Sequence, residues 1–218
     1  CILGLATGST PIGLYDRLVK LNKDGEIDFS EVTSFNLDEY YPLAKSNDQS
    51  YDYFMKEQLF NHVNVDFSRV NIPNGEATDA EAECKAYDEK IDAAGGIDIQ
   101  LLGLGENGHI AFNDPWIADF NDPKMVKIVP LDEVCRQQQV NDGCFKTLSE
   151  VPKYALTLTI PTLVSAKHLV CTVPAATKAW AVGRTVKGEI NEECPATIMR
   201  KHNSVVMFCD SDSGRELL

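Results

Sequence analysis

Residues 97–115 read IDIQLLGLGENGHIAFNDP, and this stretch decides the fold. Its beginning, residues 97–102, indicates a buried strand, which runs into a glycine-rich loop that stops at Pro115. The loop carries His109, one of four histidines in the chain, where a parallel strand would deliver a side chain to a cleft. Histidine has the unperturbed pKa closest to neutrality. We therefore predict a catalytic turn here.

The glycines of this loop, Gly103, Gly105 and Gly108, match the spacing of a dinucleotide-binding motif. That motif requires a helix that opens directly on the glycines and an acidic residue about 20 positions later. Here the sequence NDP at 113–115 breaks the chain within a few residues of the last glycine. We therefore expect no nicotinamide or flavin site, and no cofactor.

The composition is typical of a globular α/β protein. The chain has 218 residues, 44% hydrophobic and 24% charged, which suits one large domain, with two small ones as the alternative. No stretch approaches the ~18 apolar residues of a membrane span, and nothing resembles a signal peptide, so we expect a cytoplasmic protein without a membrane partner. The net charge of −13 argues against nucleic acid but not against a small anion in a locally positive pocket.

The seven cysteines are odd in number, scattered and never spaced as CxxC. We expect buried, reduced packing residues, several in apolar runs as at Cys171 and Cys209, and neither a disulfide framework nor a metal site. The chain starts at Cys1, directly before an expected strand, so we also expect a segment before it.

Apolar runs alternate with helical patterns, which indicates a single Rossmann-like α/β domain with a mostly parallel sheet flanked by helices. Strands are predicted at 2–6, 32–37, 97–102, 154–160, 168–173 and 205–209, and helices after Pro11, at 50–62, after a capping box at 78–81, and at 177–186. Thr10 is the predicted N-cap of the first helix, and the glycines at 95–96 end the third. Residues 114–152 are the least periodic, and a mobile flap and a surface excursion both fit them.

Two further loops follow predicted strands. Residues 7–11, Thr-Gly-Ser-Thr-Pro, lead into a helix N-terminus, where free N–H groups and the helix dipole favour an anion; an ordinary turn with a threonine cap is the alternative. Lys178 begins another helix, where its positive charge opposes the helix dipole. An anion bound beside it would explain a lysine at this position, and an ordinary surface lysine is the alternative.

Residues 35–40, FNLDEY, end the second strand. Asp38 and Glu39 should point to opposite sides of the extended backbone, one into the cleft and the other into solvent. A solvated acidic strand end is the alternative.

In the glycine-rich loop that stops at Pro115, His109 and Asp114 can form an oriented imidazole–carboxylate pair. The alternative is that His109 is structural, as we expect for His62, His168 and His202.

Together, TGSTP, FNLDEY and GENGHIAFNDP closely resemble the glucosamine-6-phosphate deaminase (isomerase) family, and the similarity continues through 151–157 and 177–179. The resemblance implies a Rossmann-like α/β fold and conversion of glucosamine 6-phosphate, a small-molecule sugar phosphate, to fructose 6-phosphate and ammonia. It also implies site roles: Asp38 as the proton-transfer base, His109 for ring opening with Asp114 as its carboxylate partner, Asn107 beside them, and Thr7, Gly8, Ser9, Thr10 and Lys178 as the phosphate-binding residues.

The sequence departs from the family pattern in four places. Asp114 stands where glutamate is commoner, and Gln139 falls where some members have a phosphate-binding arginine, for which Arg136 is a nearby substitute. Residues 116–122 do not resemble the allosteric segment of hexameric members, and a helix-bearing segment precedes the first strand in the family. Regulation and homo-oligomerisation therefore stay open.

Two other functions compete. The 6-phosphogluconolactonases are relatives in fold, but the aspartate of FNLDEY and the HIAFNDP continuation favour the deaminase. A non-catalytic sugar-phosphate sensor should carry a DNA-binding module, for which the chain has no room, and would not need both Asp38 and His109.

Overall fold

Six strands form a parallel sheet in the computed structural model, which describes residues 1–141 and 143–217 and, among these, the side chains of all but 134, 135, 138 and 141. Every neighbouring pair of strands in this sheet is parallel. The strands lie in the order β4 (Val70–Asn71), β2 (Thr33–Asn36), β1 (Ile2–Leu5), β5 (Ile99–Leu102), β8 (His168–Val173) and β9 (Val205–Cys209). The predicted parallel sheet is confirmed, and β8 and β9 have the predicted bounds.

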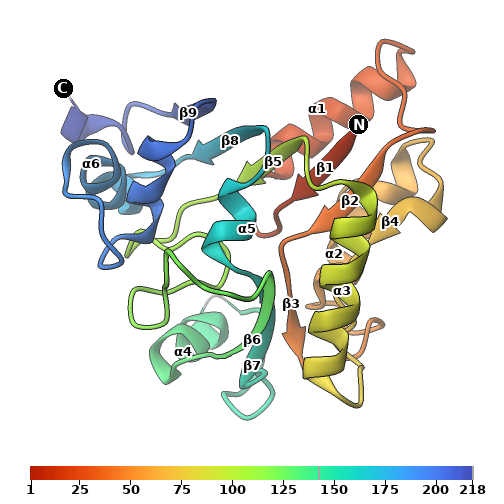
Figure 1. The fold of residues 1–218 in the computed structure, drawn as a ribbon, viewed down its shortest axis with the longest axis horizontal. Coiled ribbons are helices and arrows are strands. Elements are labelled where there is room, and N and C mark those ends of the chain that lie inside the picture. Colours follow the sequence, from red (N-terminus) through yellow and green to blue (C-terminus); the bar gives the residue numbers. More distant parts are fainter. Residues whose placement is uncertain (142, 218) are drawn as a thin grey trace.

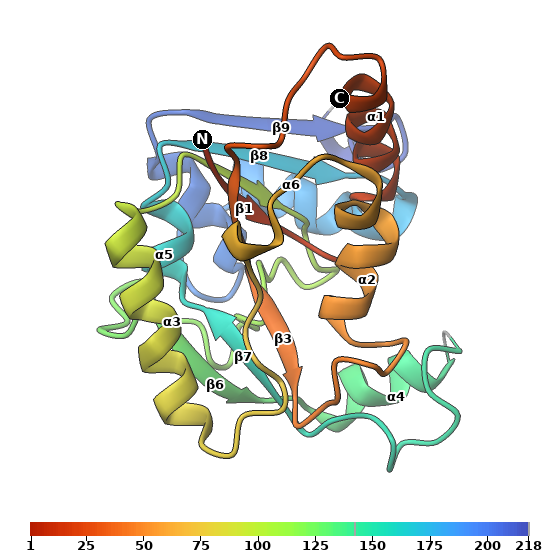
Figure 2. The same cartoon turned by 90° about the vertical axis from the view of Figure 1, so that its right-hand side faces the viewer.

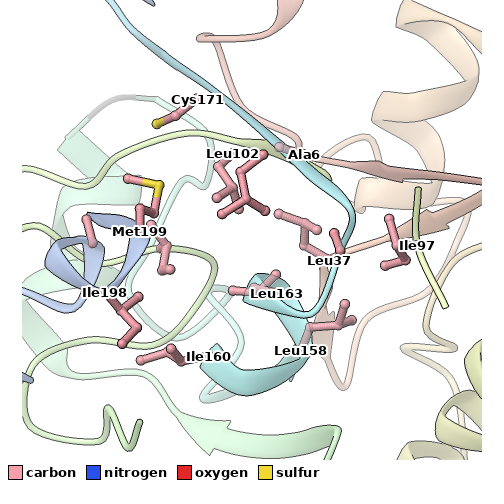
Figure 3. Close-up of a cluster of buried hydrophobic side chains, with 14 of the residues drawn as sticks. Ala6, Leu37, Ile97, Leu102, Leu158, Ile160, Leu163, Cys171, Ile198 and Met199 are labelled. Atoms are coloured by element: carbon pink, nitrogen blue, oxygen red, sulfur yellow. The ribbon is translucent and has the colours of Figure 1, made fainter. Parts of the chain in front are cut away.

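Helices cover both faces of this sheet. Figure 2 shows α1 (Ile12–Lys23) and α2 (Tyr51–Gln58) on one side of the strands, with α3 (Ala80–Ala94) and α5 (Ile160–Val164) on the other. The first pair buries Tyr15 and Met55 in a smaller apolar cluster. The second pair belongs to the larger cluster of Figure 3, where Leu37, Leu102 and Leu163 lie close together. The remaining helices are α4 (Glu133–Asn141), α6 (Ala179–Lys187) and the short 3-10 helices η1 (Phe60–His62), η2 (Phe67–Arg69), η3 (Ala176–Lys178), η4 (Pro195–Lys201) and η5 (Arg215–Leu217).

A second, antiparallel sheet was not predicted from the sequence. It consists of β3 (Asp38–Tyr41), β7 (Tyr154–Leu158) and β6 (Val126–Pro130), and Figure 1 shows it below the parallel sheet. The chain passes from one sheet to the other at Leu37, which donates to the Leu5 carbonyl (3.1 Å) and accepts from the Leu158 N–H (2.8 Å). Residues 114–152, for which we left a mobile flap and a surface excursion open, include the paired strand β6 and the helix α4.

The helix ends correct two predictions. Thr10 does not cap α1: Pro11 precedes the helix and its carbonyl accepts from Tyr15 N at 2.9 Å. The cap of α3 is Asp79 and not Thr78, because the Asp79 carboxylate accepts from the N–H groups of the two residues after Ala80, and a negative charge suits this helix end. The predicted end of α3 is confirmed, since Gly95 caps it with a left-handed φ of 85°.

The cysteine prediction is right in part. The side chains of Cys84, Cys171 and Cys194 are buried and free, but Cys1 and Cys209 are free and exposed, the latter at the end of the edge strand β9. Cys135 lies outside the described side chains. Among the described residues, no three His, Cys, Asp or Glu side chains are grouped as metal ligands, and none of the helices is long and apolar enough to cross a bilayer.

Candidate active site

The loops singled out in the sequence meet at one edge of the parallel sheet. Because β2, β1, β5 and β8 are parallel neighbours, their carboxyl ends point the same way. The loops at 7–11, 103–113 and 174–178 and the step from Leu37 to Asp38 all follow these ends. The topology thus brings the predicted phosphate loop, base and histidine loop together.

The loop at 7–11 has the shape that an anion site needs. Gly8 adopts a φ of +89°, which strains any other residue, and the space where its Cβ would lie is open. Gly8 and Ser9 are exposed, and α1 starts directly after the loop with its first-turn N–H groups free of helical acceptors. Thr7 lies deeper and hydrogen bonds with Tyr51 of α2.

Asp38 opens β3 and is buried, with 7% of its surface exposed. Burial, and secondarily the charge of Glu39, raises the pKa of Asp38 to about 8. Glu39 is buried too, with 1% exposed, so the prediction that one of these carboxylates faces solvent is wrong. Alternation does place them on opposite sides of β3, but α2 covers the Glu39 side, where Glu39 accepts from the Tyr51 and Asp52 N–H groups.

His109 and Asp114 form the predicted pair. Their Nδ1 and Oδ1 atoms are 3.0 Å apart, Asp114 is buried, and the His109 side chain is 31% exposed. Burial raises the pKa of Asp114, but the hydrogen bond and charge of His109 and the hydrogen bond from Asn107 outweigh it, so this pKa lies below its usual range. Asn107 donates to Asp114 Oδ1 (2.9 Å) and accepts from His109 N (3.1 Å).

These contacts fix the tautomer of His109. Nδ1 faces two acceptors, the Asp114 carboxylate and the Asn107 Oδ1, the latter at 2.7 Å. Nδ1 must therefore carry the proton and donate, which leaves Nε2 as the basic nitrogen of the neutral ring.

The histidine loop is fastened to the strand that pairs with Asp38. Thr157 of β7 lies opposite Asp38 in the antiparallel register, and its Oγ1 accepts from Phe112 N at 3.1 Å. The next residue, Leu158, accepts from Asn113 Nδ2 at 2.9 Å. The loop after β5 and the base at the start of β3 are thus placed by the same two residues of β7. Neither contact has a local signal in the sequence, because the partners are 45 residues apart.

Lys178 ends η3, at the same edge of the sheet, and is partly buried. Burial lowers its pKa, while the charge of Glu106 on the histidine loop opposes the shift. The preceding loop is held in an unusual shape: Ala175 has a φ of 83°, and its N–H donates to Asp210 Oδ2 at 2.9 Å. A cation therefore stands beside the histidine loop, in the segment that follows β8, the strand next to β5.

Arg136 and Gln139 differ in burial and in the hydrogen bonds that they make. The Arg136 guanidinium is buried and donates to three carbonyls, those of Leu148 (2.7 Å), Val151 (2.9 Å) and Pro152 (3.1 Å). It holds the segment that leads into β7. Gln139 is half-buried on α4, and its carbonyl accepts from Cys144 N at 2.9 Å.

Known proteins resemble this chain over nearly its whole length. The family described as glucosamine-6-phosphate isomerases/6-phosphogluconolactonase matches residues 1–119. A glucosamine-6-phosphate deaminase of Clostridioides difficile (strain 630) is 47% identical over 99% of this chain and 85% of the relative, and one of Thermoanaerobacter sp. (strain X514) is 44% identical over 98% and 82%. The chain belongs to the glucosamine-6-phosphate deaminase family.

A solved structure of a monomeric glucosamine-6-phosphate deaminase resembles the chain with a TM-score of 0.93 and 39% identity over 99% of this chain and 87% of that one. The 6-phosphogluconolactonase of Thermotoga maritima has a TM-score of 0.76 and 21% identity over 95% and 84%, a likeness in fold alone. Membership of the deaminase family and the fold predicted from the three motifs are confirmed.

Sequence reasoning missed an aromatic group that this deaminase-family member places around Asp38. Tyr51 stacks on Phe112 of the histidine loop, with centroids 6.1 Å apart and planes 4° apart, and lies 4.9 Å from Tyr40. Tyr40 also meets Phe112 (5.7 Å) and Phe145 (6.0 Å). Tyr40 lies inside FNLDEY and Phe112 inside GENGHIAFNDP, but Tyr51 and Phe145 lie outside the motifs singled out in the sequence. The three remaining histidines make ring hydrogen bonds to Glu57, Ser204 and Ala166, as structural residues do.

Gly105 offers a test of how closely the His109 ring must be held. A Cβ on Gly105 would lie 2.3–2.5 Å from three ring atoms of His109, so Gly105→Ala must push the imidazole away from Asp114. Since a displacement of about 1 Å costs on the order of 10²-fold in rate, we expect such a loss in kcat with the fold kept. Gly103→Ala is the matched control, because no atom lies within 4 Å of its Cβ position. Equal kcat values for the two variants would contradict the role of the ring position.

Proposed function

We propose that the protein isomerises and deaminates glucosamine 6-phosphate, giving fructose 6-phosphate and ammonia. One observation carries the proposal. The loop of the oriented His109–Asp114 pair and the buried base Asp38 are both held by adjacent residues of strand β7. They lie at the same edge of the parallel sheet as the phosphate-binding loop. An acid–base histidine and a separate carboxylate are what an amino-aldose needs, since its ring must open before a proton moves between carbons.

The reaction then proceeds in three stages. His109 Nε2 removes the proton of the C1 hydroxyl and returns one to the ring oxygen, and this opens the pyranose. Asp38 takes the proton from C2 while the aldehyde oxygen at C1 gains a proton, which gives a C1–C2 enolamine. Asp38 then delivers its proton to C1 as the nitrogen loses one, and this leaves a C2 imine in place of the amine. Water adds to that imine, ammonia departs, and the ketone is fructose 6-phosphate. A pKa of about 8 suits Asp38 for both accepting and returning a proton near neutrality.

The phosphate is held between the N–H groups at residues 8–10 and the Lys178 ammonium. Each charge-assisted contact is worth about 1.5–3 kcal/mol, so Lys178→Ala should raise KM by about 10- to 100-fold. Lys85→Ala, which removes an equal charge from an exposed site on α3, is the control and should leave KM unchanged. Steady-state kinetics of both variants measure this, and an unaltered KM in Lys178→Ala would remove the assignment.

Ammonia release and lactone hydrolysis distinguish the proposal from its competitors. The protein should release ammonia from glucosamine 6-phosphate and leave 6-phosphogluconolactone at its spontaneous rate. Accelerated hydrolysis of the lactone without ammonia would assign it to the lactonases instead. Binding of glucosamine 6-phosphate without turnover would mark a sensor.

We extend the proposal to the setting of the protein. The larger apolar cluster contains residues of both sheets, such as Leu102 and Leu156, which supports residues 1–218 acting as a single domain. Sugar-phosphate chemistry and the free thiols of Cys84, Cys171 and Cys194 fit the cytoplasm. Sedimentation of the protein measures whether it acts as a monomer or as a homo-oligomer.

A further inference from the structure

The buried carboxylate of Glu39, next to Asp38 on β3, accepts three backbone hydrogen bonds. Its Oε1 accepts from the N–H groups of Tyr40 (2.9 Å) and Tyr51 (3.0 Å), and its Oε2 accepts from Asp52 N (2.9 Å). Two of these N–H groups belong to the first turn of α2, which has no helical acceptors for them. A side chain of β3 thus completes the N-terminus of a helix that begins 12 residues after it.

The helix turn that Glu39 holds carries Tyr51. The Tyr51 ring stacks on Phe112 of the histidine loop, and its hydroxyl hydrogen bonds with Thr7 of the phosphate-binding loop and with Tyr40. Tyr51 therefore touches all three parts of the site: the loop after β1, the strand that carries Asp38, and the loop after β5. Its position depends on the first turn of α2, and that turn is fastened to β3 by Glu39.

Glu39 is also the charged group that raises the pKa of Asp38, after burial, which has the larger effect. The other titratable neighbours are four tyrosines, Tyr15 of α1, Tyr40 of β3, Tyr51 of α2 and Tyr87 of α3. Burial raises the pKa of each tyrosine, so all four are neutral at the pH of catalysis. On β7, Asp38 faces Thr157, which does not titrate. Among these neighbours, Glu39 is therefore the one whose substitution removes a charge that acts on Asp38.

We propose that Glu39 is a positioning residue for the reaction, which lies next to Asp38 on β3 and fastens α2 to β3 so that Tyr51 links the three loops. The inference rests on the proposed function. It assigns no contact with substrate to Glu39, because its two oxygens are occupied by three backbone N–H groups and its surface is buried.

Glu39→Gln tests the proposal, since glutamine keeps the shape, loses the charge and presents an NH₂ group to a backbone N–H. We expect kcat to fall by about 10-fold or more, on the order of what a small displacement of a catalytic group costs. We also expect the acidic limb of the kcat/KM profile to move to lower pH by about one unit, because a neighbouring charge shifts a carboxyl pKa by that order. The sign follows from the role of Asp38 as a base: a less basic Asp38 stays ionised at lower pH.

Ser50→Ala is the matched control. The Ser50 hydroxyl caps the same helix, accepting from Tyr53 N at 3.0 Å, but it makes no contact with Asp38. Both substitutions should lower the melting temperature, and only Glu39→Gln should move the pH profile. Equal pH profiles for Glu39→Gln and Ser50→Ala, with the loss confined to stability, would reduce Glu39 to a helix cap and overturn the proposal.

Carboxyl-carbon NMR separates this inference from the proposed reaction. The Asp38 signal, assigned by its absence in Asp38→Asn, should titrate at a lower pH in Glu39→Gln than in the unmodified protein, whether or not ammonia is released. An unchanged Asp38 titration would contradict the inference even if the protein proves to be a deaminase.

Discussion

Asp38→Asn should abolish most of the turnover, lowering kcat by about 10²–10⁴-fold, the usual contribution of a general base. Asparagine has the shape of aspartate but accepts no proton at neutral pH, so transfer from C2 to C1 stops while the phosphate-binding contacts remain. The dissociation constant for a non-reacting sugar phosphate should therefore stay within a few-fold of that of the unmodified protein. The rate of ammonia release and a binding titration measure the two effects.

The same substitution should stabilise the fold. The pKa of Asp38 is about 8 in the folded protein and near 4 in an unfolded chain, so the folded state binds more protons between these values. Stability is then lost as pH rises through this window, and Asn, which does not titrate, escapes the loss. The melting temperature of Asp38→Asn should exceed that of the unmodified protein more at pH 8 than at pH 5, by about 2–4 °C for each kcal/mol. A difference that shrinks with rising pH would show that Asp38 is not held in a desolvated site.

His109→Gln should slow the enzyme by a comparable amount on the closed sugar. The structure gives His109 a free Nε2 and a fixed Nδ1–H, and glutamine can do neither the acid nor the base step of ring opening. A substrate supplied in open-chain form should recover part of the rate, because the proton transfer by Asp38 is intact. Full activity of His109→Gln on the ring form would make the loop structural and the mechanism wrong.

Asp114→Asn separates orientation from acid–base chemistry. The amide keeps a hydrogen bond to Nδ1 or to Asn107 but removes the charge that favours the imidazolium. The loss in kcat should be milder than in His109→Gln, because the imidazole and its Nε2 remain in place. Steady-state kinetics of the two variants measure the difference.

The local parts of the site could be predicted from the sequence. His109 and Asp114 are five residues apart, so one tight loop suffices to pair them, and their partner Asn107 lies in the same turn. The strands at 168–173 and 205–209 are short apolar runs with clear ends, and the structure has them with those bounds.

The parts that depend on distant contacts could not be predicted. The strand was predicted at 32–37 and the further strand at 38–41 was missed, because nothing local shows that Leu37 bonds to two different sheets. The strand at 126–130 has no clean alternation of buried and exposed residues, and it was hidden in the least periodic region. Glu39 was expected in solvent because the sequence does not show that α2 folds back over it.

The central claim is that Asp38 moves a proton within glucosamine 6-phosphate at a site completed by the His109 loop. NMR of the reaction in deuterated water tests it most directly. We expect fructose 6-phosphate and ammonia in equal amounts, with deuterium at C1 of the sugar from the unmodified protein and neither product above background from Asp38→Asn. Deuterium incorporation by Asp38→Asn at the unmodified rate, or ammonia without fructose 6-phosphate, would contradict the account.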